Sequence, residues 1–157
     1  MTVVIIIETK EDIMFEVNQI SVFLSNKAGR IADVCEILGS SGIDLVALSV
    51  ADTESYGVLR IITDNNEKAA AILRENGFII SSTNVLAVEI SNEPGALAEV
   101  LKSFDSEGIS IEYIYAFVGT AGRSARIIIR VNDNAKGIEA LRKTGAGIIT
   151  KEDIENK

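Results

Sequence analysis

The chain has 157 residues, which is enough for one ordinary domain or two small ones. Hydrophobic residues make up 47% and charged residues 24%, a balance typical of a folded chain and not of a disordered one. Fifteen basic against 23 acidic residues give a formal charge of −8, which argues against a dedicated nucleic-acid-binding surface. The absence of histidine excludes Ser-His and Cys-His catalysis and most zinc sites.

The single Cys35 excludes a disulfide within the chain and is typical of a reducing compartment, so we expect a cytoplasmic protein. The apolar run at residues 3–7 is far shorter than the roughly 18–20 residues that span a bilayer, so no membrane association is expected. The regular pattern begins after Met14. Residues 1–13 are therefore interpreted as an N-terminal extension, either a short added strand or an appendage with Met14 as an alternative start.

An internal repeat emerges when the sequence is shifted on itself by 66 residues. The stretch 25–29 (SNKAG) then coincides with 91–95 (SNEPG), and Gly42 coincides with Gly108. Later in each repeat the offset becomes 68, and we place the two extra residues in the turn around 119–122. The sequence therefore predicts a duplicated domain, with one copy at residues 14–83 and the other at 84–152.

Each repeat is predicted to run strand, helix, strand, strand, helix, strand. In the first repeat the alternation of Ile20, Val22 and Leu24 with polar neighbours indicates a strand, and an apolar stripe from Ile31 to Leu38 indicates the next helix. The further elements of the first repeat are expected at 43–51, 58–63, 67–76 and 78–82. Those of the second are expected at 86–90, around 97–104, and at 109–118, 125–131, 135–144 and 148–150. This order predicts an α+β fold of two ferredoxin-like βαββαβ units, each with an antiparallel four-stranded sheet and two helices on one face.

Two other features have expected structural roles. Cys35 lies within the apolar stripe of the first helix, so we expect a buried small hydrophobe and not a nucleophile. Arg123, Arg126 and Arg130 cluster on the hairpin of the second repeat. They either bind an anionic ligand or acidic partner, or form a solvated face paired with acids such as Glu112, and we favour the solvated face.

The loop between the first strand and first helix of each repeat, at 26–29 and 92–95, is the segment expected to carry chemistry. Asn and Gly favour the turn, and the unpaired first N–H groups of the helix suit a carboxylate. We expect Asp44, at the start of the next strand, to lie near that end of the helix and to accept an ammonium group. The pair would suit an amino acid. The alternative is that Asn and Gly only build the turn.

The residues of this loop resemble a known signature. The second repeat has NEPGAL at 92–97 and GISI at 108–111, which resembles the ACT domain pattern Asn-x-Pro-Gly-x-Leu followed by Gly-Ile-Asn-Ile. The first repeat has the similar stretches NKAGRI at 26–31 and GIDL at 42–45. The resemblance covers about residues 15–150. It implies a tandem ACT protein without a catalytic domain, of a family that typically binds amino acids at interfaces between paired ACT units.

Carrying the family's site over residue by residue implies two half-sites. The first consists of Asn26, Ala28, Gly29, Arg30, Ile31 and Asp44. The second consists of Asn92, Pro94, Gly95, Ala96, Leu97 and Ser110. Ala28 departs from the usual Pro, and Ser110 cannot neutralise an ammonium group as Asp44 can. We therefore expect unequal half-sites, with the first better suited to an amino acid.

These observations predict a regulatory protein and not an enzyme. We expect it to bind a small-molecule ligand, an amino acid, to form a homodimer and to signal allosterically to a metabolic enzyme, with no cofactor, metal, nucleic acid or membrane involved. The alternative is a ligand-free regulatory or assembly subunit of an amino-acid biosynthetic enzyme. A third interpretation is a small ferredoxin-like enzyme of the acylphosphatase type, because Arg30 stands close to Asn26, although the loop has no Gly-rich phosphate cradle.

Overall fold

The computed structural model describes residues 10–25, 27–52, 56–119 and 122–156, and the described part of the chain divides into two compact units. The first-half unit contains the described residues of Asn18–Thr83, Phe117–Gly119 and Glu152–Lys157. The second-half unit contains those of Met1–Val17, Asn84–Ala116 and Thr120–Lys151. The N-terminal segment of the chain thus belongs to the second-half unit, and the C-terminal segment belongs to the first-half unit.

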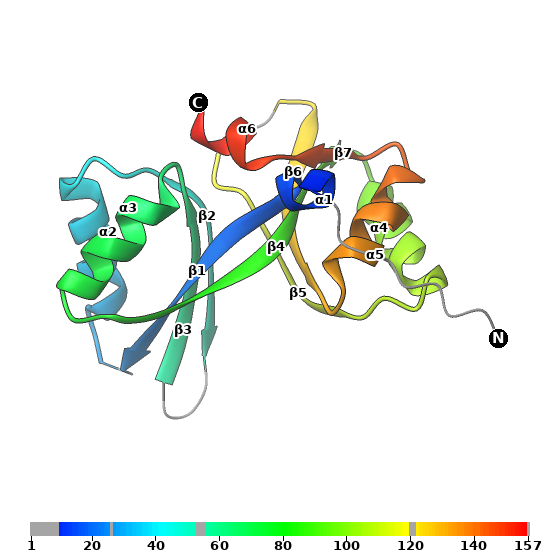
Figure 1. Ribbon diagram of the computed structural model, residues 1–157. Helices are drawn as coiled ribbons and strands as arrows, with labels where there is room; N and C mark the ends of the chain where they lie inside the picture. The colour runs from blue at the N-terminus through cyan, green and yellow to red at the C-terminus, as the bar shows by residue number, and fades with distance from the viewer. Residues whose placement is uncertain (1–9, 26, 53–55, 120–121, 157) are drawn as a thin grey trace. The chain divides into compact units, whose positions relative to one another are not determined.

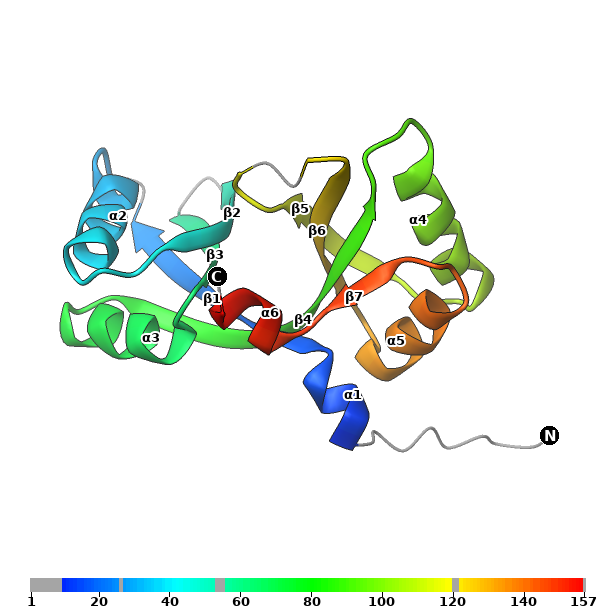
Figure 2. The same cartoon turned by 90° about the horizontal axis from the view of Figure 1, so that it is seen from above.

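The first-half unit has the order of elements that its repeat predicts. Its elements are β1 (Glu16–Ser25), α2 (Arg30–Ser40), β2 (Leu45–Asp52), β3 (Tyr56–Thr63), α3 (Asn66–Glu75) and the beginning of β4 (Ile79–Ser91). The strand order is β2-β3-β1-β4, and β3 pairs antiparallel with β1 and β2. α2 and α3 lie side by side (Figures 1 and 2). After α2, the Ile43 N–H donates to the Leu38 carbonyl and so closes the C-terminal end of the helix.

The second-half unit repeats this arrangement. It contains the rest of β4, then α4 (Ala96–Ser106), β5 (Ile111–Ala116), β6 (Ser124–Val131), α5 (Asn134–Arg142) and β7 (Gly147–Ile149). β6 pairs antiparallel with β4 and β5, and β7 pairs with the other side of β4. α4 and α5 lie side by side (Figures 1 and 2). The prediction of an α+β, ferredoxin-like fold is confirmed.

One strand differs from its prediction. The sequence predicts separate strands at 78–82 and 86–90, but the structure has the single strand β4, Ile79–Ser91. The residues between the two predicted strands, Thr83–Val85, include no glycine or proline, so neither of these residues interrupts an extended backbone there.

A separate core lies between sheet and helices in each unit. In the first-half unit Ile20, Val22 and Leu24 of β1 face Val34 and Leu38 of α2. Alternate residues of β1 therefore point to the helices, as period two requires. In the second-half unit Leu86 and Val88 occupy the corresponding places on β4, against Val100 and Phe104 of α4. The buried stripe of α2 is narrower than predicted.

The prediction that Cys35 is buried is wrong, because its thiol-bearing side chain is exposed. Val34 and Leu38, four residues apart, lie against the sheet, and Cys35 is rotated about 100° further around a helix of 3.6 residues per turn. Ile31, the first residue of the predicted stripe, is also exposed. The counterparts Leu97 and Leu101 in α4 are half-buried, so the two helices cover their sheets to different extents.

Both ends of the described chain are helical. α1 (Lys10–Met14) lies in the second-half unit, and most of α6 (Lys151–Glu155) lies in the first-half unit, where Ile154 is buried. The part of the predicted N-terminal extension at residues 1–9 lies outside the described residues. Among the helices that are described, none is long and apolar enough to cross a membrane.

Candidate functional site

The loop of the first predicted half-site ends at Gly29, the residue that precedes α2. Gly29 has φ +87°, in the left-handed region that favours glycine, and its carbonyl accepts the Asp33 N–H at 2.9 Å. Lys27, Ala28 and Gly29 are exposed. Asn26 lies outside the described residues. A Cβ at Gly29 would contact nothing within 4 Å, so the glycine is required by backbone conformation and not by crowding.

The second predicted half-site has the same backbone. Gly95 precedes α4 with φ +93°, and its carbonyl accepts the Glu99 N–H at 3.2 Å. Asn92, Pro94 and Gly95 are exposed, and the Asn92 N–H donates to the Arg123 carbonyl at 2.9 Å. Ala96 and Leu97 are half-buried, and Leu97 packs against the core of this unit.

Neither loop supplies a side-chain cap to the helix that it precedes, since the capping position is glycine in both. The first N–H groups of a helix have no partner within the helix and carry the positive end of its dipole. Both helices therefore begin with exposed glycine loops whose first turn suits an anionic oxygen, although in α4 the Ala96 N–H already donates to the Glu93 carbonyl at 3.2 Å.

Arg30, at the first position of α2, forms an ion pair with Asp33 at 3.1 Å. Its guanidinium also lies over the ring of Phe78, 4.7 Å from the centroid. The local carboxylate offsets the unfavourable placement of a cation at a helix N-terminus. In the second repeat Ala96 takes the place of Arg30 and Glu93 takes the place of Lys27, so the segment 26–30 carries a formal charge of +2 and the segment 92–96 a formal charge of −1.

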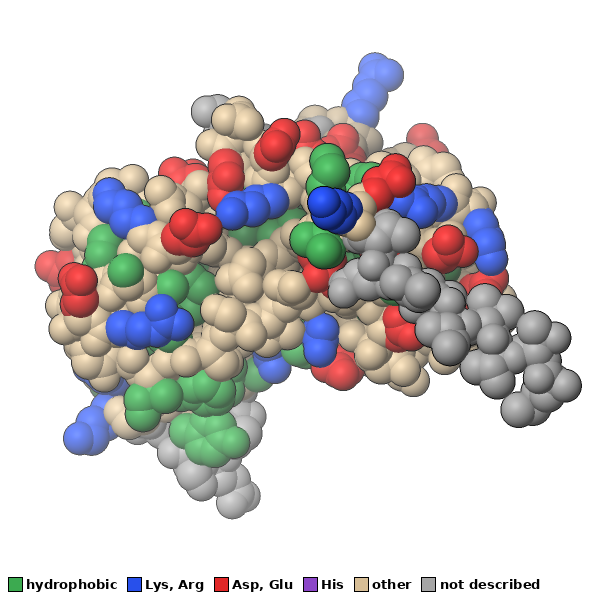
Figure 3. Space-filling view, viewed as in Figure 1, with side chains coloured by type: hydrophobic (Ala, Val, Ile, Leu, Met, Phe, Trp, Pro, Cys, Tyr) green, Lys and Arg blue, Asp and Glu red, His purple; other side chains and the backbone are tan. Residues whose placement is uncertain are grey.

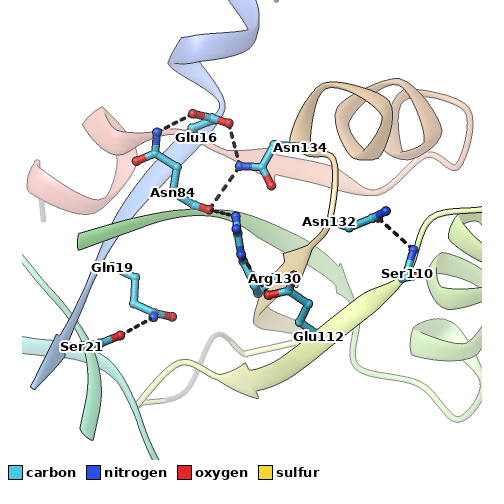
Figure 4. Close-up of polar contacts among 9 residues, drawn as sticks. All are labelled: Glu16, Gln19, Ser21, Asn84, Ser110, Glu112, Arg130, Asn132 and Asn134. Carbon is cyan, nitrogen blue, oxygen red and sulfur yellow. Dashed lines mark hydrogen bonds and ion pairs between the residues drawn. The ribbon is translucent and has the colours of Figure 1, made fainter. Parts of the chain in front are cut away.

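Asp44 and Ser110 occupy equivalent places, at the starts of the segments that lead into β2 and β5. The Asp44 N–H donates to the Asp64 carboxylate at 3.0 Å, and the Asp64 N–H donates back to the Asp44 carbonyl at 3.1 Å. Ser110 and Asn132 make the same pair of contacts, at 3.0 and 3.1 Å (Figure 4). Sequence reasoning missed Asp64 and Asn132, although the offset of 68 aligns them.

The expectation that Asp44 lies near the beginning of the first helix is wrong. α2 runs from Arg30 to Ser40, and Asp44 follows its C-terminal end, whereas Gly29 precedes its N-terminal end. A helix of this length separates its two ends by about 16 Å at 1.5 Å per residue. The same holds for Gly95 and Ser110 on either side of α4. Within one repeat, each predicted half-site is therefore divided between the two ends of a helix.

Two of the three arginines of the second-repeat cluster form ion pairs, as favoured above. Arg126 binds Glu89 at 2.8 Å, and Arg130 binds Glu112 at 3.3 Å (Figure 4). On the face drawn in Figure 3, acidic and basic side chains are interspersed. Within the described residues, no three His, Cys, Asp or Glu side chains gather in a way that would hold a metal ion.

A second polar cluster was not predicted from the sequence. The Glu16 carboxylate accepts from the side-chain amides of Asn84 and Asn134, both at 2.6 Å (Figure 4). The Asn84 carbonyl accepts from Asn134 at 3.1 Å and from Arg130 at 2.8 Å. The repeat offers a signal for part of it, because Asn66 and Asn18 are the equivalents of Asn134 and Asn84.

The geometry of two glycine-headed helices in a duplicated βαββαβ chain agrees with the family model that matches. The model of the ACT domain pair covers residues 15–156. The chain belongs to the ACT domain pair family. This confirms the resemblance that the NEPGAL and NKAGRI stretches indicate. The match includes both repeats from residue 15 onward and all of α6.

Several solved structures are similar to this ACT domain pair. A crystal structure of a protein from Bacteroides thetaiotaomicron is 35% identical, has a TM-score of 0.84 and is matched over 98% of its length and 91% of this chain. The regulatory subunit of aspartate kinase from Thermus thermophilus, in its ligand-free form, is 18% identical with a TM-score of 0.62, over 93% of its length and 83% of this chain. The corresponding subunit from Thermus flavus is 18% identical with a TM-score of 0.56, over 91% of its length and 81% of this chain. At 18% identity, the two subunits show a shared fold. No curated protein matches the chain.

Proposed function

We propose that this ACT domain pair is a regulatory protein that binds an amino acid between paired ACT units and signals through it to a metabolic enzyme. The ACT units of the proposal span residues 14–83 and 84–152. The observation that carries it is the pair of exposed glycine-headed loops before α2 and α4, at equivalent places in both repeats. The names of the similar Thermus proteins, regulatory subunits of aspartate kinase, support a regulatory role.

The chemistry of the loops favours a carboxylate. N–H groups at a helix N-terminus bind anionic oxygens, and Arg30 in the first repeat adds a cation there, whose attraction is reduced by its ion pair with Asp33. Asp44 would accept the ammonium group. Because Asp44 lies beyond the other end of α2, a ligand that touches both groups must lie between a loop of one ACT unit and Asp44 of another unit.

We also propose a homodimer, in which one chain supplies the loop and the other supplies Asp44. A site assembled from two units binds ligand only in the arrangement that brings them together, so ligand and assembly favour each other. A coupling of about 1–3 kcal/mol is typical of such linkage. The partner enzyme would respond to the arrangement that the ligand favours. Light scattering should show a dimer, and a stable monomer at all concentrations would contradict an intermolecular site.

A thermal-shift panel of the twenty amino acids tests the proposal most directly. At 100 times its Kd, a ligand that binds only the folded state adds about 2.7 kcal/mol to the free energy of unfolding. We expect one amino acid, or a few of similar structure, to raise the melting temperature at millimolar concentration. No stabilisation by any of them would favour the ligand-free assembly subunit.

The two half-sites should contribute unequally to binding. We expect Asp44→Ala to weaken ligand affinity by about tenfold or more, because a charged hydrogen bond contributes about 1.5–3 kcal/mol. Ser110→Ala should change affinity less than Asp44→Ala. Titration calorimetry compares the two variants with the unaltered chain, and Asp44→Asn isolates the charge. Equal losses from Asp44→Ala and Ser110→Ala would contradict the unequal sites.

A further inference from the structure

Residues 10–16, here called the strap, hold the C-terminal end of α5. Arg142, the last residue of α5, lies 3.5 Å from the carboxylate of Asp12 and 3.9 Å from that of Glu11. Its guanidinium also lies over the Phe15 ring, 5.5 Å from the centroid. Asp12 is buried, with 6% of its surface exposed, and Phe15 packs against the core of the second-half unit. A buried carboxylate facing an arginine is costly to leave unpaired, so this contact resists release of the strap.

The other end of the strap holds the beginning of α5. Glu16 accepts from the amide of Asn134, the first residue of α5, and from Asn84 of β4 (Figure 4). Both hydrogen bonds are 2.6 Å long and involve a carboxylate, which makes them stronger than bonds between neutral groups. One seven-residue segment therefore contacts both the first and the last residue of α5.

The equivalent helix of the first-half unit is held in another way. Asn66, the counterpart of Asn134, donates to the Asn18 carbonyl and accepts from both the N–H and the hydroxyl of Thr63, each at 2.8 Å. In the second repeat Val131 stands where the first has Thr63, and Oδ1 of Asn134 is a buried atom without a hydrogen-bond partner among the described residues. Asn134 keeps the equivalent bond to the Asn84 carbonyl, at 3.1 Å, so the strap adds a contact only where the first repeat has those between Thr63 and Asn66.

The strap is covalently continuous with the first-half unit. Its last residue, Glu16, is the first residue of β1, and residues from Asn18 onward in that strand belong to the first-half unit. β1 lies between β3 and β4 in the strand order, so it is a central strand. The C-terminal segment makes the reverse crossing, because residues 152–156 group with the first-half unit and Ile154 there is 4% exposed.

We propose that the strap couples the two units, so that a displacement of β1 in the first-half unit changes the stability of α5 in the second-half unit, and the reverse. Coupling requires a physical element whose state both units influence, and the strap is attached to one by the chain and to the other by Arg142 and Asn134. The role that we give to this coupling, the transmission of a ligand's effect between the ACT units, rests on the proposed function.

Hydrogen exchange on the full chain, read by mass spectrometry without added amino acid, tests the coupling. We compare Arg142→Ala with Arg74→Ala, since Arg74 occupies the equivalent position in the last turn of α3. Arg142→Ala should speed exchange at least fivefold in α5 and at least twofold in residues 18–24 of β1. Arg74→Ala should leave exchange in both β1 and α5 within twofold of the unaltered chain.

A second variant keeps the test decisive where Arg142→Ala unfolds the chain. Glu16→Gln removes the carboxylate but retains the shape of the strap, and it should raise exchange in α5 and β1 together. Faster exchange in α5 with an unchanged exchange rate in β1 would overturn the coupling, because the strap would then stabilise only α5. Equal responses to Arg142→Ala and Arg74→Ala would overturn it as well. Because no ligand is present, neither outcome bears on amino-acid binding, and a failed ligand panel leaves this result standing.

Discussion

The second helices of the two repeats fill the same place with different residues. α3 carries Ala69 at the position where α5 carries Gly137, and both residues are buried. On the neighbouring helix, Leu38 of the first core corresponds to Phe104 of the second. A Cβ at Gly137 would lie 2.7 Å from Cδ1 of Leu86, 3.2 Å from Cγ2 of Val131 and 4.0 Å from Cε1 of Phe104.

This difference shows how duplicated cores diverge. A larger side chain on one helix is accompanied by the loss of a methyl group on the other, so the total volume changes less than either position alone. Close-packed interiors tolerate substitutions that together conserve volume better than a single substitution that changes the volume. The effect of a substitution therefore depends on the other side chains of the same core, and a residue cannot be moved from one repeat to the other without regard to them.

The largest expected effect comes from placing the residue of the first repeat into the second. Gly137→Ala should lower the free energy of unfolding by about 1–2 kcal/mol, because overpacking outweighs the better helix propensity of alanine. Urea unfolding measures it. Leu86→Val shortens the side chain that the new methyl meets, and the double variant should lose less than the sum of the single variants. Strict additivity would mean that Leu86 is not the obstacle.

An intermediate effect is expected from changes to the hydrogen bonds of Asn66 and its counterpart Asn134. Thr63→Val removes a hydroxyl that donates to Asn66, and it should cost about 1 kcal/mol. The reverse change, Val131→Thr, places a donor near the unpartnered Oδ1 of Asn134, so we expect the stability to stay the same or to rise. Thermal unfolding of both variants compares the repeats. A loss from Val131→Thr as large as that from Thr63→Val would contradict the assigned role of this buried oxygen.

The smallest effect concerns an ion pair that the first repeat lacks. Lys143 donates to the Glu107 carboxylate at 2.6 Å, while the equivalent residues of the first repeat are Glu75 and Ser41. The hydrogen bond and charge of Glu107 raise the pKa of Lys143 above its ordinary value of 10.5. Because the pKa of Lys143 is higher in the folded state, the ion pair contributes fully to the stability of the fold below pH 10.5. This contribution is lost as the pH rises through the pKa of the folded state.

Lys143→Met should therefore lower the melting temperature slightly at neutral pH, since the pair is exposed and screened by solvent. The difference from the unaltered chain should vanish in strongly alkaline solution. Glu75→Met is the matched control at the equivalent position, and it should show no such pH dependence. A difference for Lys143→Met that persists at alkaline pH would mean that packing, and not charge, is responsible.

Much of the fold follows from local patterns. The change of offset from 66 to 68 is confirmed by the strand register, because Ile20 pairs with Ile61 in one unit and Leu86 pairs with Ile129 in the other. Period-two alternation and apolar stripes located the strands and helices, since these patterns reflect which residues face a sheet or a core. The loops at Gly29 and Gly95 were likewise predictable, because glycine is the residue that accepts their positive φ.

The mistakes share a different origin. Cys35 follows the apolar periodicity of α2 and is exposed, because only as much of a helix is buried as its sheet covers. Asp44 was placed at the wrong end of α2 because a sequence motif shows spacing along the chain and not separation across a helix. The continuity of β4 was not predicted because the polar residues 81–84 interrupt its apolar alternation, although the strand contains neither glycine nor proline.

The sequence by itself determined the duplication, the order of elements in each repeat and the two glycine-headed loops, because each depends on residues close together in the chain. Only the tertiary structure decided that Glu16 meets Asn134 and that Asp12 meets Arg142, contacts that join residues more than a hundred positions apart. Such pairs leave no periodic signal, since a single carboxylate in an N-terminal segment has many candidate partners. Packing selects among them by where the segment enters β1.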